Sequence, residues 1–162
     1  MMLDPGKTTG IATSDTFGVV TFEAPMAEAG ECIEKWCKIV RHGSICWEAF
    51  TITPVTYRMP EASTAIEMIG IARYFALKYR ITIIPARARQ ARSACPPVML
   101  KALGLHHPGK PHANDAARHL VAQMISAGTL PKAYHDILSS WIQERGDVNA
   151  VRGAAGGGSP ED

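Results

Sequence analysis

The sequence has few cysteines, no long apolar run and no signal-peptide pattern, and each absence excludes a class of protein. The four cysteines (Cys32, Cys37, Cys46 and Cys95) show no C-x-x-C spacing, so reduced thiols are expected rather than a disulfide framework. The most apolar region, residues 65–86, is interrupted by charged side chains and predicts no membrane span. The N-terminal residues do not have a basic segment followed by an apolar core. We therefore expect a cytoplasmic protein with no membrane partner.

The length and composition predict one globular domain. The 162 residues include 46% hydrophobic and 20% charged side chains, which is enough apolar material for a sizeable core. The segment 146–162 is rich in glycine and alanine and cannot build a core of its own. We therefore expect a folded domain over residues 1–145 and a disordered C-terminal tail over residues 146–162.

The charge is unevenly distributed although the net charge is only +2. Residues 80–118 contain seven Lys or Arg and one acid, whereas residues 1–50 contain seven acids and four bases. A basic segment that carries one acid is typical of a protein that binds phosphates and places metal ions among them. The alternative is an ordinary solvated basic face.

The hydrophobic periodicity predicts an α/β fold. Strands are expected at 1–3, 9–13, 18–22, 44–50 and 80–85, the first three forming an antiparallel meander. Helices are expected at 27–40, 61–79, 98–103, 112–127 and 133–145.

Four side chains are candidates for a divalent-metal site. Asp4 ends the first strand just before a Pro-Gly turn, and Glu48 lies in an otherwise apolar strand, where a carboxylate must be paired, exposed or bound to a cation. His112 and Asp115 are three residues apart, so a helix presents them from one face. Two alternatives stay open: Glu48 faces solvent on an alternating strand, and His112 and Asp115 simply begin a surface helix.

These residues stand in a recognisable order along the chain. Residues 3–12 read L-D-P-G-K-T-T-G-I-A, residues 47–49 read W-E-A, and residues 112–119 read H-A-N-D-A-A-R-H. In this order the motifs resemble those of the RuvC-like Holliday junction resolvases of the RNase H-like nuclease superfamily, particularly the bacteriophage type. The resemblance covers about residues 1–127 and implies an RNase H-like fold, a five-stranded mixed sheet flanked by helices.

The resemblance also implies a site and a reaction. Asp4, Glu48, His112 and Asp115 would be the catalytic metal ligands for two Mg²⁺ or Mn²⁺ ions that hydrolyse a phosphodiester. Asp4 would bridge both ions, with Glu48 on the nucleophile side and His112 and Asp115 on the other. The substrate would be branched DNA, four-way junctions first and forks and flaps as further candidates. The enzyme would be a homodimer, and a phage-encoded protein would act in the host cytoplasm.

Several further residues are candidates for supporting roles. His119 could orient Asp115 or contact phosphate, or it could be a packed histidine. Candidate DNA contacts are Lys7, Thr8, Arg87, Arg89, Arg92, Lys101 and Lys110. Residues 87–111 do not match the basic, glycine-bearing segment of bacterial resolvases. Two alternatives therefore stay open: a less selective nuclease for branched or single-stranded DNA or RNA–DNA hybrids, and a catalytically silent nucleic-acid-binding module.

Overall fold

The computed structural model describes residues 1–40, 42–48, 60–86, 91 and 94–155. Its strands are β1 (Met2–Asp4), β2 (Thr8–Ser14), β3 (Val19–Pro25), β4 (Ser44–Glu48) and β5 (Thr82–Ala86). Its helices are α1 (Met26–Ile39), α2 (Pro60–Lys78), α4 (Pro97–Ala102), α5 (Pro111–Ala127) and α6 (Lys132–Ala155). Every strand and helix predicted from the sequence is present, with ends that differ by a few residues except in α6.

The strands form one five-stranded mixed sheet in the order β3-β2-β1-β4-β5. β1 pairs with β2 and β2 with β3 in antiparallel fashion, whereas β4 runs parallel to both β1 and β5. The β2–β3 hairpin closes on Asp15, whose Oδ1 accepts hydrogen bonds from the amides of Phe17 at 2.8 Å and Gly18 at 3.0 Å. This turn fixes the register that places Gly10 opposite Glu23.

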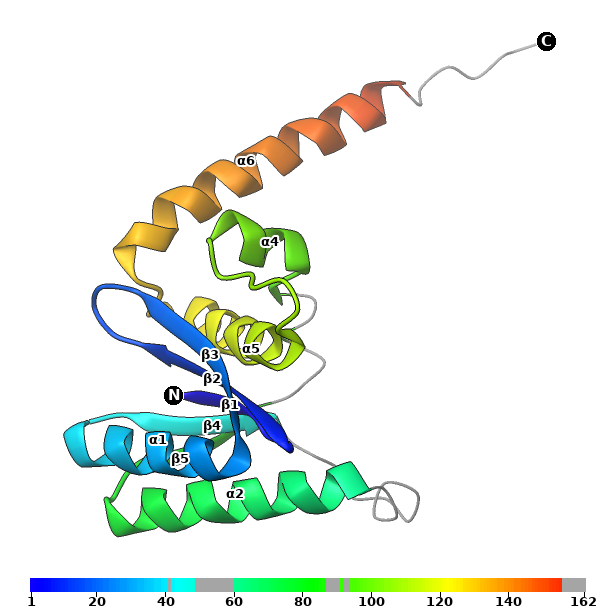
Figure 1. The fold of residues 1–162 in the computed structure, drawn as a ribbon. Helices are drawn as coiled ribbons and strands as arrows, with labels where there is room; N and C mark the ends of the chain where they lie inside the picture. The colour runs from blue at the N-terminus through cyan, green and yellow to red at the C-terminus, as the bar shows by residue number, and fades with distance from the viewer. Residues whose placement is uncertain (41, 49–59, 87–90, 92–93, 156–162) are drawn as a thin grey trace.

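Helices cover both faces of the sheet (Figure 1). α1 and α2 lie on one face, α4 and α5 lie on the other, and α6 leads away from the body. Leu3, Ile11 and Ile45 point into the core under α1 and α2. Met2, Ala12 and Cys46, the neighbours of those residues, point into the core under α4 and α5. The alternation of a β-strand thus supplies two cores from a single sheet.

The same alternation determines on which face of the sheet the two strand acids, Asp4 and Glu48, lie. Asp4 follows Leu3, and Glu48 lies two residues after Cys46, so both carboxylates are on the α5 side of the sheet. They stand at the carboxyl ends of adjacent parallel strands, β1 and β4. The fold therefore brings together two acids that are 44 positions apart in the sequence.

The last helix is longer in the structure than the sequence predicted. α6 continues to Ala155, ten residues beyond the end predicted at Arg145, and the alanines at 150, 154 and 155 favour helix there. Residues 156–162 of the predicted disordered tail lie outside the described residues. No helix in the described part of the chain is long and apolar enough to cross a membrane.

Candidate active site

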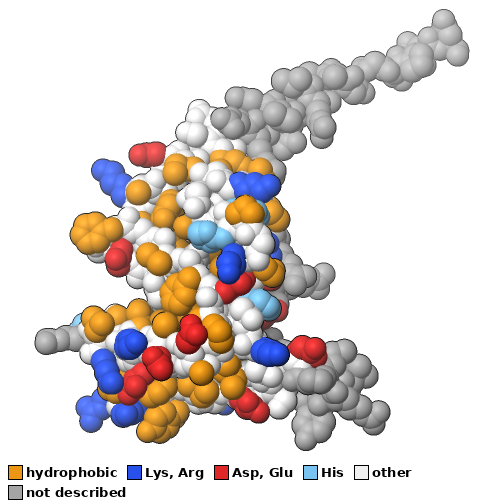
Figure 2. Space-filling model, viewed as in Figure 1, with side chains coloured by type: hydrophobic (Ala, Val, Ile, Leu, Met, Phe, Trp, Pro, Cys, Tyr) orange, Lys and Arg blue, Asp and Glu red, His pale blue; other side chains and the backbone are white. Residues whose placement is uncertain are grey.

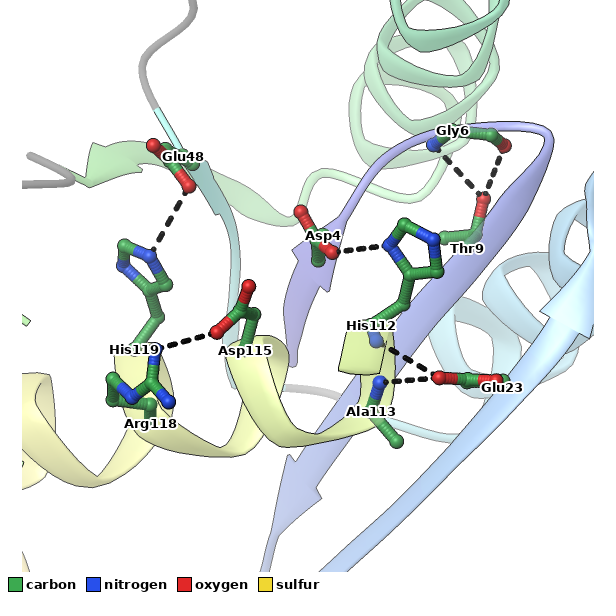
Figure 3. Close-up of polar contacts among 10 residues, drawn as sticks. All are labelled: Asp4, Gly6, Thr9, Glu23, Glu48, His112, Ala113, Asp115, Arg118 and His119. Atoms are coloured by element: carbon green, nitrogen blue, oxygen red, sulfur yellow. Dashed lines mark hydrogen bonds and ion pairs between the residues drawn. The ribbon is translucent and has the colours of Figure 1, made fainter. Parts of the chain in front are cut away.

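The predicted ligands from strand and helix face one another across the sheet edge (Figure 3). α5 begins at Pro111, which suits the first helical position, and ends at Gly128, whose φ of 65° terminates the helix. Its first turn lies over β1, where Nδ1 of His112 is 2.7 Å from Oδ2 of Asp4. With Asp4 ionised, Nδ1 carries the proton and donates this hydrogen bond.

The other two carboxylates are also held by side chains of α5. Oε2 of Glu48 lies 3.3 Å from Nε2 of the buried His119, and Oδ1 of Asp115 accepts a 2.6 Å hydrogen bond from Nη1 of Arg118. The sequence left three roles open for His119, and in the structure its buried ring lies beside Glu48 rather than Asp115. α5 carries His119 over the end of β4, so Glu48 is its neighbour, while Arg118 reaches Asp115 within one turn.

The environment of Asp4 disfavours its charged form. Burial raises the pKa of Asp4, and the nearby Asp115 and Glu48 carboxylates raise it further. The hydrogen bond and charge of His112 lower the same pKa without reversing the net shift. The three carboxylates are therefore close enough to repel one another, which is the electrostatic situation that a bound cation relieves.

Two residues that the sequence analysis missed hold the first turn of α5. Oε1 of Glu23, on β3, accepts hydrogen bonds from the amides of His112 at 2.8 Å and Ala113 at 3.1 Å. Gly10, on β2, lies directly under this turn, where a Cβ atom would clash with the His112 carbonyl and stand 2.9 Å from the Ala113 nitrogen. Asp4, Gly10 and Glu23 form one row across β1, β2 and β3. That register is the signal by which Glu23 could have been found.

A cavity of about 390 Å³ opens beside this row. Asp4, Glu48 and His112 line it together with Lys7 and Thr8, two of the predicted DNA contacts. Its wall also includes Glu61, at the start of α2, which the sequence analysis did not select. Thr9 shapes the rim, because its Oγ1 donates a 3.0 Å hydrogen bond to the carbonyl of Gly6.

The remaining predicted DNA contacts are only partly described. Arg87, Arg89 and Arg92 lie outside the described residues. Lys101 is exposed on α4, and Lys110 is exposed just before α5, with Nζ 3.9 Å from Oε2 of Glu23. Two lysines of α1 pair with acids, Lys35 with Glu31 and Lys38 with Glu34. On the face shown in Figure 2, basic side chains are interspersed with acidic ones. That part of the surface has no continuous basic patch.

The donor set fits a divalent ion in its chemistry. Carboxylate oxygens suit Mg²⁺, and an added imidazole accommodates Mn²⁺. Within the described residues, no three His, Cys, Asp or Glu side chains are arranged to hold one ion, because each carboxylate is turned toward a partner on α5. Ion binding therefore requires some of these side chains to turn toward a common point.

Comparisons with known proteins identify the fold. No family model and no curated protein matches the sequence. Among solved structures, T. thermophilus RuvC in complex with a Holliday junction substrate superimposes with a TM-score of 0.60 and 13% identity, over 78% of this chain and 94% of that chain. A second Thermus thermophilus RuvC structure gives a TM-score of 0.55 and 14% identity, over 78% and 95%. The chain thus has the RuvC fold, and the predicted RNase H-like class is confirmed.

Proposed function

We propose that the protein is a metal-dependent, structure-selective endonuclease that resolves four-way DNA junctions by phosphodiester hydrolysis. The observation that carries this proposal is the meeting of Asp4, Glu48 and Asp115 at one sheet edge, beside His112, in a RuvC fold. The similar structure of T. thermophilus RuvC was determined with a Holliday junction substrate, which supports this choice of substrate class.

Asp4, Glu48, Asp115 and His112 would hold two Mg²⁺ or Mn²⁺ ions. When bound, the ions supply a nucleophile at neutral pH and neutralise charge on the leaving oxygen. The side chains have complementary tasks: Asp4 is central to the cluster, His112 orients it through the 2.7 Å hydrogen bond, and His119 orients Glu48. Lys7 and Thr8, which line the cavity, would contact the backbone of the cleaved strand.

Paired cleavage of a junction requires two active sites, so the proposal includes a homodimer. The outer face of α2 is the candidate contact, because Tyr74 and Leu77 are exposed there at 60% and 72%. A neighbouring hollow of about 480 Å³ is lined by Gly70, by four apolar or aromatic side chains and by Glu67. A sedimentation equilibrium measurement tests this part, and a monomer at micromolar concentration contradicts it.

The test of the activity is cleavage of a labelled four-way junction beside matched linear duplex, single strand and fork. Each substrate is incubated with Mg²⁺, with Mn²⁺ and with chelator. We expect paired, metal-dependent nicks in the junction alone. Asp115→Asn should abolish cleavage and leave junction binding intact, whereas Asp136→Asn, at an exposed acid of α6, should change neither.

Other outcomes select the other candidates. Cleavage of several branched or single-stranded substrates, or of an RNA–DNA hybrid, would indicate a less selective nuclease. Tight binding with no cleavage of any substrate would indicate a silent binding module. Loss of both binding and cleavage in Asp115→Asn would show that Asp115 is structural.

A further inference from the structure

We propose that Glu23 is a positioning residue that sets the first turn of α5 and thereby the place of His112. This inference rests on the proposed function for its catalytic consequence, but its structural part is independent of it. Glu23 comes from β3, the edge strand farthest from β4, and nothing in the motifs at 3–12, 47–49 or 112–119 includes it.

Glu23 has this role because backbone amides in the first turn of α5 need a hydrogen-bond acceptor from outside the helix. An α-helix begins with amides that have no partner inside the helix, and a side chain just before the helix usually accepts from them. Here the residue in that position is Lys110, which makes no side-chain cap. Pro111 has no amide hydrogen, and the amide of Asn114 donates to the Lys110 carbonyl at 3.1 Å. The His112 and Ala113 amides remain, and both donate to the same oxygen of Glu23.

The carboxylate is well placed for this task. Only 9% of the Glu23 side chain is exposed, so water competes poorly for its oxygens. Its negative charge lies at the positive end of α5, where an anion is favoured. Its other oxygen, Oε2, has Lys110 Nζ at 3.9 Å, at the limit of an ion pair. The strong contacts of Glu23 are therefore those to the backbone of α5.

The consequence for the site is geometric. The backbone amide of His112 donates a hydrogen bond to Glu23, and the ring of the same residue lies 2.7 Å from Asp4. The ring cannot keep that position unless its backbone is fixed, and β3 fixes it through Glu23. Glu23 is not among the residues that line the cavity, yet through the His112 amide it controls the position of the His112 ring beside Asp4.

The first experiment measures amide hydrogen exchange by NMR in the full chain, for wild type, Glu23→Ala and Glu23→Gln. In Glu23→Ala we expect exchange at His112 and Ala113 to accelerate about tenfold or more, the factor that corresponds to one lost hydrogen bond. The amide of Val121, in the middle of α5, should keep its rate. Glu23→Gln should resemble wild type, because its amide oxygen can accept both hydrogen bonds.

The second experiment measures junction cleavage by the same variants with Mn²⁺. We expect kcat to fall roughly a hundredfold in Glu23→Ala, as misplacement of a reacting group by about 1 Å can cause. KM should be unchanged, Glu23→Gln should restore most of kcat, and Glu31→Ala, at an exposed acid of α1, should have no effect.

These outcomes are decisive in either direction. Wild-type exchange at His112 and Ala113 in Glu23→Ala would overturn the proposal, as would equal losses in Glu23→Ala and Glu23→Gln, which would point to charge rather than position. If the wild-type protein cleaves no DNA, the proposed function fails, while the exchange rates still decide whether Glu23 holds α5.

Discussion

Replacing Gly10 by alanine tests how tightly α5 is seated on the sheet. The added Cβ would overlap the His112 carbonyl and lie 2.9 Å from the Ala113 nitrogen, whereas an ordinary contact is about 3.5 Å or longer. The first turn of α5 must therefore move by roughly 1 Å. A shift of that size stretches the 2.7 Å contact between His112 and Asp4 beyond hydrogen-bonding range.

The expected cost has two parts. Overpacking of this kind destabilises a protein by about 1–3 kcal/mol, which lowers Tm by several degrees in a domain of this size. Displacement of His112 should reduce junction cleavage roughly a hundredfold with binding retained.

The matched control for Gly10→Ala is Gly30→Ala, inside α1. There the new Cβ would meet Ile71 Cγ2 at 3.5 Å, an ordinary contact. This variant should gain about 0.5–1 kcal/mol and keep its activity, because alanine favours a helix more than glycine does. Thermal unfolding and the junction assay measure both effects. A Gly10→Ala protein with wild-type Tm and wild-type cleavage would refute the close seating of α5.

Three further predictions follow from the electrostatics. Arg118→Ala should tighten Mn²⁺ binding on the order of tenfold, measured by calorimetry, because it frees Asp115 from a competing cation; unchanged affinity would contradict this. The folded protein binds the Asp4 proton more tightly than the unfolded chain, so the Asp4 contribution to the free energy of unfolding falls as pH rises through the raised pKa. In the presence of chelator, the free energy of unfolding of Asp4→Asn, measured by urea titration, should therefore increase relative to that of wild type between acid and neutral pH. A difference in free energy that does not change with pH would count against this prediction. Burial raises the pKa of Cys95 to about 11, so iodoacetamide near neutral pH should label the partly exposed Cys32 in the folded protein and Cys95 only after unfolding; equal labelling of the folded protein would argue against this burial.

Much of the fold could be predicted because the local signals agree with the final structure. The short apolar run that begins at Ser44 and the helical periodicity at residues 112–127 each specify the element that forms. The position of Asp4 before a Pro-Gly turn predicted a strand end, and the structure places it there. The strand order then determines which carboxylates lie at the same edge of the sheet. The family resemblance was needed to predict that order.

The rest depended on properties that a single sequence does not specify. Glu23 was missed because β3 was expected to end at Phe22, whereas the strand continues to Pro25 and carries Glu23 beneath α5. The contact between His119 and Glu48 was not predicted, because periodicity gives the faces of a helix but not its rotation against a sheet. That rotation is decided by packing, here by the absence of a side chain at Gly10.

The contacts that complete the site also determine when it forms during synthesis. The Asp4–His112 contact joins residues 108 positions apart, and the Glu23 contacts span 89 and 90 positions. Contacts of such long sequence separation close late in folding, and on a ribosome they cannot close before α5 has emerged. The acids of β1 and β4 are made first and remain without the imidazole until most of the chain exists. An incomplete chain therefore carries these acids without the side chains that α5 adds to the site.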